Sequence, residues 1–357
     1  MRDEGHNLNV VSLTRSLVDI PSITEEEEHA LLFLESTLQD IAVMYGGTVE
    51  RMPVEARRFN LYANWPNAGI APVTFSTHVD TVPPFFPSSE DEEHVYGRGA
   101  CDAKGILACM IIAIANLLER GVRGLGLLIV VGEERGSTGA LVAGDPSASG
   151  MTDQGSGFLV NGEPTENKLA LGTKGALRLE LRAKGKMAHS AYPELGESAI
   201  DKLLDVLEQA RMIALPNDPV LGQSTMNIGV IQGGRAPNVI ADEAEAQILI
   251  RLVDDGESTR VALRSIAEGK LDISEILYIP AMQFSPLSGF ESTAVAYTTD
   301  IPLLSPAWGE PYLLGPGNIH VAHTLEERVL KSELFEAVRL YEKLASELLA
   351  KHSAKER

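Results

Sequence analysis

Hydrophobic and polar positions along the first part of the chain predict helices that alternate with short buried strands. Apolar residues recur with helical periodicity over 12–20 and 27–38, and a continuous apolar run over 106–118 predicts a buried helix. Three shorter apolar runs have the length and composition of buried strands, at 73–77, 125–131 and 157–160. Such alternation is typical of an α/β fold in which helices cover a mostly parallel sheet.

A second pattern begins near Lys174 and continues to about residue 283. Its segments are strand, helix, strand, strand, helix and strand, at 176–183, 197–212, 224–232, 243–252, 258–268 and 273–280. This is the order of a ferredoxin-like α+β unit. We therefore expect a main domain in two parts, 1–173 and 284–357, with a ferredoxin-like domain at 174–283 inserted between them.

The C-terminal segment carries apolar residues at the spacing of an amphipathic helix over 326–349. Thr324 and Glu327 form the capping-box pattern that is expected at the start of such a helix. This helix is expected to close the main domain.

Composition and charge narrow the class of partner. Fifty Asp and Glu outnumber thirty Lys and Arg, which gives a net charge of -20 and a pI near 4.8. Phosphate backbones and anionic lipids would be repelled, so we expect a small-molecule partner, no nucleic acid and no membrane. The chain begins Met1-Arg2-Asp3-Glu4 rather than with a basic and apolar leader, and no apolar run is long enough to span a bilayer. These features favour a cytoplasmic protein, in which Cys101 and Cys109 are buried packing residues.

Acidic and imidazole side chains follow the predicted strands of the main domain. His78 follows 73–77, the pair Glu133 and Glu134 follows 125–131, and Glu163 follows 157–160. Because the carboxyl ends of parallel strands share one edge of a sheet, we expect these side chains to meet. Imidazole and carboxylate groups are ligands of Zn²⁺ and related cations, so the pattern predicts a metal centre.

Further residues extend this candidate set. Asp102, before the helix predicted at 106–118, could be a further metal ligand, with helix capping as the alternative. His323 precedes the C-terminal helix, and His320 is the alternative ligand. Asp80 is two residues from His78, the spacing of a carboxylate that holds the second ring nitrogen of a metal-bound imidazole. In the Glu-Glu pair, one carboxylate can ligate while its neighbour acts as a general base.

The glycines Gly97 and Gly99 also suggest a dinucleotide-binding loop. The third glycine of that motif is replaced by Asp102, whose charge would repel a phosphate. A nicotinamide-dependent oxidoreductase is therefore disfavoured.

Together these motifs resemble the family of co-catalytic zinc deacylases and peptidases that includes acetylornithine deacetylase, succinyl-diaminopimelate desuccinylase, aminoacylase and glutamate carboxypeptidase. The resemblance covers essentially the whole chain and rests on five segments in the family's order, at 76–83, 96–105, 132–137, 161–165 and 322–324. One departure is Gly132, where the family usually has an acidic or small polar residue. That position is not a ligand in the family.

The resemblance implies two Zn²⁺ ions, for which Co²⁺ or Mn²⁺ could substitute. In this pattern His78 and Glu163 hold one ion, Glu134 and His323 hold the other, and Asp102 bridges them. Glu133 would be the general base for a water that bridges the metals, and Asp80 would orient His78.

The inserted domain would act as a dimerisation and lid domain in a homodimer. His189 would reach the active site of the partner subunit and stabilise the oxyanion; a plain loop histidine is the alternative. Asn238 and Arg251 would hold the substrate carboxylate, although Arg251 could instead pair with Asp254 or Asp255. Gly315 would offer backbone contact to the substrate.

The resemblance also implies hydrolysis of the amide bond of an N-acyl amino acid. We expect acetylornithine deacetylase, an enzyme of arginine biosynthesis. The alternatives are succinyl-diaminopimelate desuccinylase and a hydrolase of carrier-linked lysine or ornithine in lysine biosynthesis. A dipeptidase or carboxypeptidase and a non-catalytic binding relative are more remote, the last because every position of the family's metal centre is filled.

Overall fold

The computed structural model describes residues 9–66, 70–145 and 157–355, which form two compact units. Unit 1 comprises residues 1–171, 284–293 and 299–357, and unit 2 comprises 172–283 and 294–298. The prediction that the chain has no basic and apolar leader rests on its first four residues, which lie outside the described residues. No helix among the described residues is both long and apolar enough to cross a membrane.

Unit 1 is built on a six-stranded sheet with the order β1-β2-β6-β3-β7-β17. Strands β6, β3, β7 and β17 are parallel neighbours, whereas β2 is antiparallel to both β1 and β6. The strands span Thr48–Glu55 (β1), Arg58–Trp65 (β2), Val73–His78 (β3), Leu125–Val130 (β6), Phe158–Asn161 (β7) and Glu310–Leu313 (β17). The sheet is thus mostly parallel, as expected.

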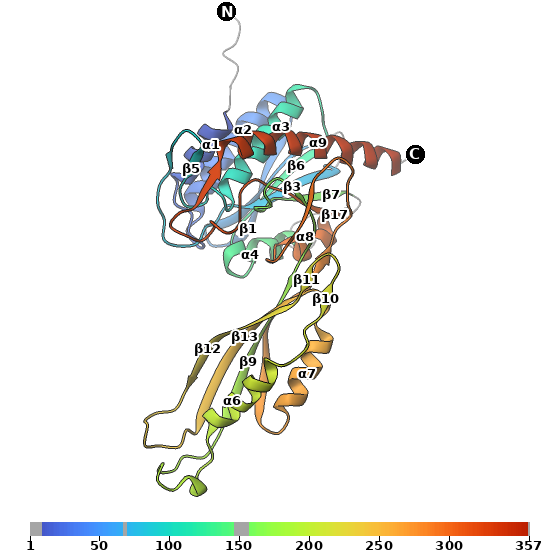
Figure 1. The fold of residues 1–357 in the computed structure, drawn as a ribbon. Helices are drawn as coiled ribbons and strands as arrows, with labels where there is room; N and C mark the ends of the chain where they lie inside the picture. Colours follow the sequence, from blue (N-terminus) through green and yellow to red (C-terminus); the bar gives the residue numbers. More distant parts are fainter. Residues whose placement is uncertain (1–8, 67–69, 146–156, 356–357) are drawn as a thin grey trace, which may run out of the picture. The chain divides into compact units, whose positions relative to one another are not determined.

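Helices cover both faces of this sheet (Figure 1). Alternate strand residues separate the faces: Leu127 and Ile129 belong to the larger core, and Leu128 and Val130 to the smaller one. The larger core includes α1 (Val10–Val18), α2 (Glu28–Tyr45), α3 (Lys104–Glu119) and α9 (Lys331–Lys355). The smaller core includes α4 (Thr138–Gly144) and α8 (Ile301–Trp308). Helix α3 is buried along most of its length, which explains its continuous apolar run.

Unit 2 has a four-stranded antiparallel sheet with the order β12-β13-β9-β14. Two helices cover one face of this sheet through a core of Leu, Ile, Val and Ala side chains (Figure 1). The elements are β9 (Gly175–Lys184), α6 (Ala199–Ala210), β12 (Thr225–Gly233), β13 (Glu243–Leu252), α7 (Glu257–Ala267) and β14 (Leu271–Ile279). Their order confirms the ferredoxin-like prediction.

Several short strands complete the chain. They are β4 (Ser89–Glu90), β5 (His94–Tyr96), β8 (Leu169–Thr173), β10 (Asn217–Asp218), β11 (Gly222–Gln223), β15 (Met282–Gln283), β16 (Ser292–Val295) and β18 (Arg328–Leu330). Strand β18 pairs with β5 in unit 1.

The start predicted for the C-terminal helix is wrong. Helix α9 begins at Lys331, because β18 occupies the residues just before it. Glu327, expected in a capping box, is buried and directs its carboxylate to another loop. The cysteines are free and buried, as predicted.

Candidate metal centre

Two overlapping groups of side chains in unit 1 bring imidazole and carboxylate atoms together. One group is His78, Asp102 and Glu163, and the other is Asp102, Glu134 and His323. Within each group the candidate ligand atoms lie within 4.8 Å of one another. Asp102 belongs to both, with Oδ1 at 3.1 Å from His78 Nε2 and Oδ2 at 3.4 Å from His323 Nε2. This donor set fits two divalent cations that share one carboxylate.

The topology of the sheet explains why these residues meet. His78 is the last residue of β3, Glu134 lies in a 3-10 turn after β6, and Glu163 follows β7. These strands are parallel, so their carboxyl ends share one edge of the sheet. Asp102 is in the loop before α3 but does not cap that helix, whose N-cap is Ala103.

Asp80 supports both His78 and the turn that carries the Glu-Glu pair. Its backbone oxygen lies 3.0 Å from His78 Nδ1, and its carboxylate Oδ1 lies 3.5 Å from the same nitrogen. The carboxylate accepts hydrogen bonds from the backbone nitrogens of Glu133 at 3.1 Å and Glu134 at 3.2 Å, and from Thr24 Oγ1 at 2.8 Å. Asp80 therefore fixes the orientation of a candidate ligand and of the candidate base together.

The 3-10 turn also explains the departure at Gly132. This residue has a φ of +73°, and a Cβ there would lie 2.4 Å from Thr138 Oγ1. Any side chain would be strained at this position, so glycine suits the turn that presents Glu133 and Glu134.

Carboxylates are crowded at the centre. Burial raises the pKa of Glu163 well above its usual value; the charge of His78 opposes this and that of Asp102 adds to it. Burial and the charge of Glu163 likewise raise the pKa of Glu133. Divalent cations would relieve this crowding because they stabilise ionised carboxylates.

His323, rather than His320, joins the centre. His323 Nε2 lies 2.9 Å from Glu134 Oε1, and its hydrogen bonds with Asp102 and Glu134 raise its pKa to about 10. The residue has a φ of +62°, a left-handed conformation that is uncommon outside glycine. His320 is exposed and donates its backbone N–H to Asn318 Oδ1.

Two buried acids near the centre were missed by the sequence analysis. The Glu327 carboxylate accepts hydrogen bonds from three backbone nitrogens of the loop that ends at Asp102. Asp300 precedes α8, and burial raises its pKa to about 6, with its side-chain hydrogen bond to Ser137 opposing. Asp300 belongs to no motif, and the motif that contains Glu327 predicts helix capping instead, so only the tertiary contacts identify these roles.

The remaining predicted site residues lie in both units. Gly315 is in unit 1, where its Cα packs so closely on Glu163 that a Cβ would lie 2.5 Å from the Glu163 carbonyl oxygen. In unit 2, His189 and Asn238 are exposed in adjacent loops, joined by a hydrogen bond from Ser190 N to Asn238 O of 3.1 Å. Arg251 is half-buried, and burial lowers the pKa of its guanidinium.

The alternative pairing of Arg251 is not observed. Asp254 and Asp255 instead accept hydrogen bonds from the backbone nitrogens of Gly256 and Glu257. The guanidinium therefore stays a candidate for a substrate carboxylate.

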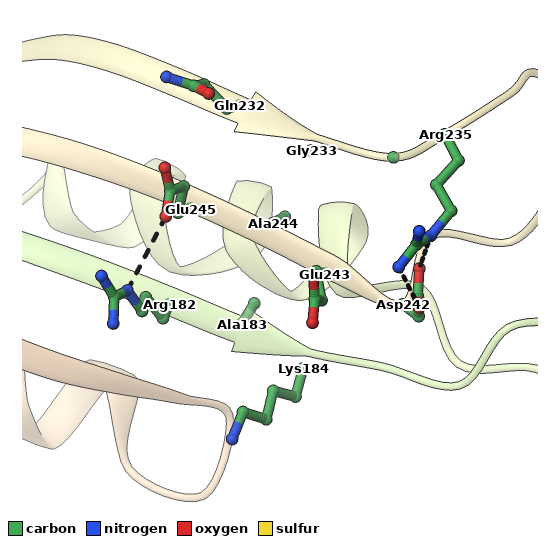
Figure 2. Close-up of a pocket in the computed structure, with 11 residues that line it drawn as sticks. Arg182, Ala183, Lys184, Gln232, Gly233, Arg235, Asp242, Glu243, Ala244 and Glu245 are labelled. Carbon is green, nitrogen blue, oxygen red and sulfur yellow. Dashed lines mark hydrogen bonds and ion pairs between the residues drawn. The ribbon is translucent and has the colours of Figure 1, made fainter.

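A pocket in unit 2 offers a different kind of surface (Figure 2). Two ion pairs lie among the residues that line this pocket: Arg235 pairs with Asp242, and Arg182 pairs with Glu245. Most of the charge of the lining arginines is therefore neutralised within the pocket. None of the predicted site residues lines it.

Comparison with known proteins identifies relatives over nearly the whole length. A peptidase dimerisation domain matches residues 171–271. The chain is 38% identical over 349 residues to a peptidase M20 domain-containing protein of Schizosaccharomyces pombe, covering 94% of this chain and 84% of that protein. It is also 38% identical over 375 residues to a probable carboxypeptidase of Aspergillus terreus, covering 94% and 85%.

Solved structures share the fold. Aminopeptidase PepT from Bacillus cereus superposes with a TM-score of 0.77 at 21% identity, covering 96% of this chain and 98% of that one. A dinuclear metal-binding peptidase of the M20 family from Bacillus subtilis superposes with a TM-score of 0.66 at 16% identity, covering 94% and 96%.

Proposed function

This chain belongs to the M20 peptidase family, and we propose that it releases a C-terminal amino acid by metal-dependent hydrolysis of the preceding amide bond. The observation that carries this proposal is the pair of ligand groups sharing Asp102, with Glu133 next to the ligand Glu134. The relatives show the family and the enzyme class, and we infer the roles of the residues and the substrate.

We assign His78 and Glu163 to one metal, Glu134 and His323 to the other, and Asp102 to both. When bound, the metals would polarise the amide carbonyl and make the attacking water more acidic. The ligands are of the kind that Zn²⁺ prefers, and Co²⁺ or Mn²⁺ accept the same donors.

Glu133 is the proposed general base. It accepts the proton of the attacking water and delivers it to the departing amine nitrogen. Asp80 holds Glu133 in place through the backbone nitrogen of that residue. Burial raises the pKa of Glu133, which favours a carboxyl group that can deliver a proton, whereas bound cations would favour the ionised form that accepts one.

The substrate class is a peptide or N-acyl amino acid with a free carboxylate. The relatives named as probable carboxypeptidases support such a substrate. In this proposal Asn238 and Arg251 hold the carboxylate, because a guanidinium can bind both its oxygens at once. N-acetylornithine, the substrate expected from the sequence, belongs to the same chemical class, but the names of the relatives do not single it out.

A homodimer formed through unit 2 is part of the proposal, supported by the match to a peptidase dimerisation domain. His189 would then complete the active site of the partner subunit as a donor to the oxyanion.

The test is a substrate panel with and without chelator, in which released amine is measured. The panel holds N-acetylornithine, other N-acetyl amino acids, N-succinyl-diaminopimelate and dipeptides, each with its C-terminal amide as the matched control. We expect chelator-sensitive turnover of substrates with a free carboxylate and none of their C-terminal amides. Equal turnover of the amides would refute the assigned substrate class, and turnover insensitive to chelation would refute the metal mechanism.

A further inference from the structure

We propose that Glu327 is a positioning residue of the metal centre, whose carboxylate fixes the loop that presents Asp102 and thereby sets the affinity for both metals. This inference rests on the proposed function, because it assumes that Asp102 bridges two cations. It concerns a residue outside both ligand groups.

One oxygen of Glu327 organises the whole loop. Oε1 accepts hydrogen bonds from the backbone nitrogens of Gly99 at 2.9 Å, Cys101 at 3.2 Å and Asp102 at 3.1 Å. The last of these bonds is made by the residue that carries the bridging carboxylate. A shift of Glu327 would therefore move the backbone of Asp102 directly.

The second oxygen is neutralised in the interior. Glu327 Oε2 accepts a hydrogen bond from Arg98 Nη1, and both side chains are 1% exposed. Arg98 is itself held by the Pro84 carbonyl oxygen at 3.2 Å and lies over the Phe86 ring. A buried carboxylate is costly unless it is paired and hydrogen-bonded, and here all the partners belong to the loop region it would position.

The same residue also anchors the segment that carries His323. Gly97 N donates to the backbone oxygen of Glu327 at 3.1 Å, and β18 begins at the next residue and pairs with β5. His323 is only four residues before Glu327. Asp102 and His323, which approach within 3.4 Å of each other, are thus attached to one buried anchor.

A purely structural role would give a different result from a positioning role. An anchor that only stabilises the chain would alter unfolding but leave the affinity of the folded protein for metal unchanged. Groups that orient metal ligands typically change metal affinity or activity by about 10-fold to 100-fold when they are altered.

The test uses Glu327→Gln, which keeps the size of the side chain but replaces one oxygen by an NH₂ group. That group cannot accept from Arg98 if Oε1 continues to accept from the loop. Glu326→Gln is the matched control. The neighbouring Glu326 side chain is 85% exposed, and its Oε2 lies 3.9 Å from Arg328 Nη1 in an ion pair at the surface. The metal-free proteins are titrated with Co²⁺ by calorimetry, and the visible absorption of the bound Co²⁺ reports its coordination geometry.

We expect Glu327→Gln to weaken Co²⁺ binding by about 10-fold to 100-fold and to change the absorption spectrum, while Glu326→Gln matches the wild type. Wild-type affinity and spectrum in folded Glu327→Gln would overturn the inference. If that variant does not fold, Glu327→Asp keeps the charge opposite Arg98 but withdraws the oxygens from the loop. The Co²⁺ affinity and the absorption spectrum of Glu327→Asp are then compared with those of the wild type, with the same expected and refuting results. Failure of the wild-type protein to bind Co²⁺ would instead refute the proposed function.

Discussion

Replacing Asp80 by Asn perturbs the turn that carries the proposed base Glu133 and the proposed ligand Glu134, while every ligand side chain remains present. The two carboxylate oxygens of Asp80 serve different donors: Oδ1 accepts from Glu133 N, and Oδ2 accepts from Glu134 N and Thr24 Oγ1. Asparagine has one acceptor oxygen and turns an NH₂ group towards the other side. At least one backbone N–H of the turn therefore loses its acceptor.

The number of hydrogen bonds that are lost sets the expected decrease in kcat. A hydrogen bond to a charged group contributes about 1.5–3 kcal/mol, and about 1.4 kcal/mol corresponds to tenfold in rate. We therefore expect kcat to fall by about 10-fold to 100-fold. At saturating metal the variant should still hold both ions, because all five proposed ligands are present and the backbone oxygen of Asp80 still lies 3.0 Å from His78 Nδ1.

The assay measures kcat on the best substrate of the panel and bound metal by elemental analysis. Thr24→Val is the matched control, because it removes one bond to Oδ2 and leaves both bonds to the turn. Because both bonds to the turn remain, kcat for Thr24→Val should stay close to the wild-type value. A kcat for Asp80→Asn within twofold of the wild type would refute the reasoning that this carboxylate positions the base.

Three further predictions test the base, a ligand and the fold. Glu133→Ala should abolish turnover and retain metal; loss of both metals would show that this residue is a ligand. His323→Ala should lose metal and His320→Ala should not, as measured by elemental analysis, and the reverse result would exchange their roles. Glu27→Gln breaks a buried pair with Arg58 and should cost about 3–5 kcal/mol of unfolding free energy in urea, whereas Glu55→Gln, on the exposed side of the same Arg58, should cost less than about 1 kcal/mol. Equal effects of Glu27→Gln and Glu55→Gln would contradict this account.

The sequence predicts the centre of the fold well where hydrophobic burial decides the structure. The strands around Phe75 and Leu127 and the helix around Met110 are buried on all sides, so their apolar runs are continuous. The candidate ligands follow from the same logic, since residues after parallel strands meet at one edge. Strands β1 and β2 were not predicted, and β1 is largely exposed and carries a mixed polar and apolar pattern.

Long-range polar contacts explain where sequence reasoning failed. Thr324 and Glu327 match a helix-capping pattern, yet Glu327 bonds to a loop more than two hundred residues away in the chain. No local pattern in the sequence identifies Arg98 as the partner of Glu327. The same holds for Asp300, whose burial depends on packing between α8 and the rest of unit 1.

The most direct test of the central claim starts from protein made metal-free with a chelator that is then removed. This protein is titrated with Zn²⁺ while bound metal and release of a C-terminal amino acid are both measured. The two ligand groups predict that two ions bind per chain and that release is absent in the metal-free protein and restored by metal. Undiminished release after complete removal of metal, or no binding of Zn²⁺ by the folded protein, would contradict the assignment of a dinuclear hydrolase.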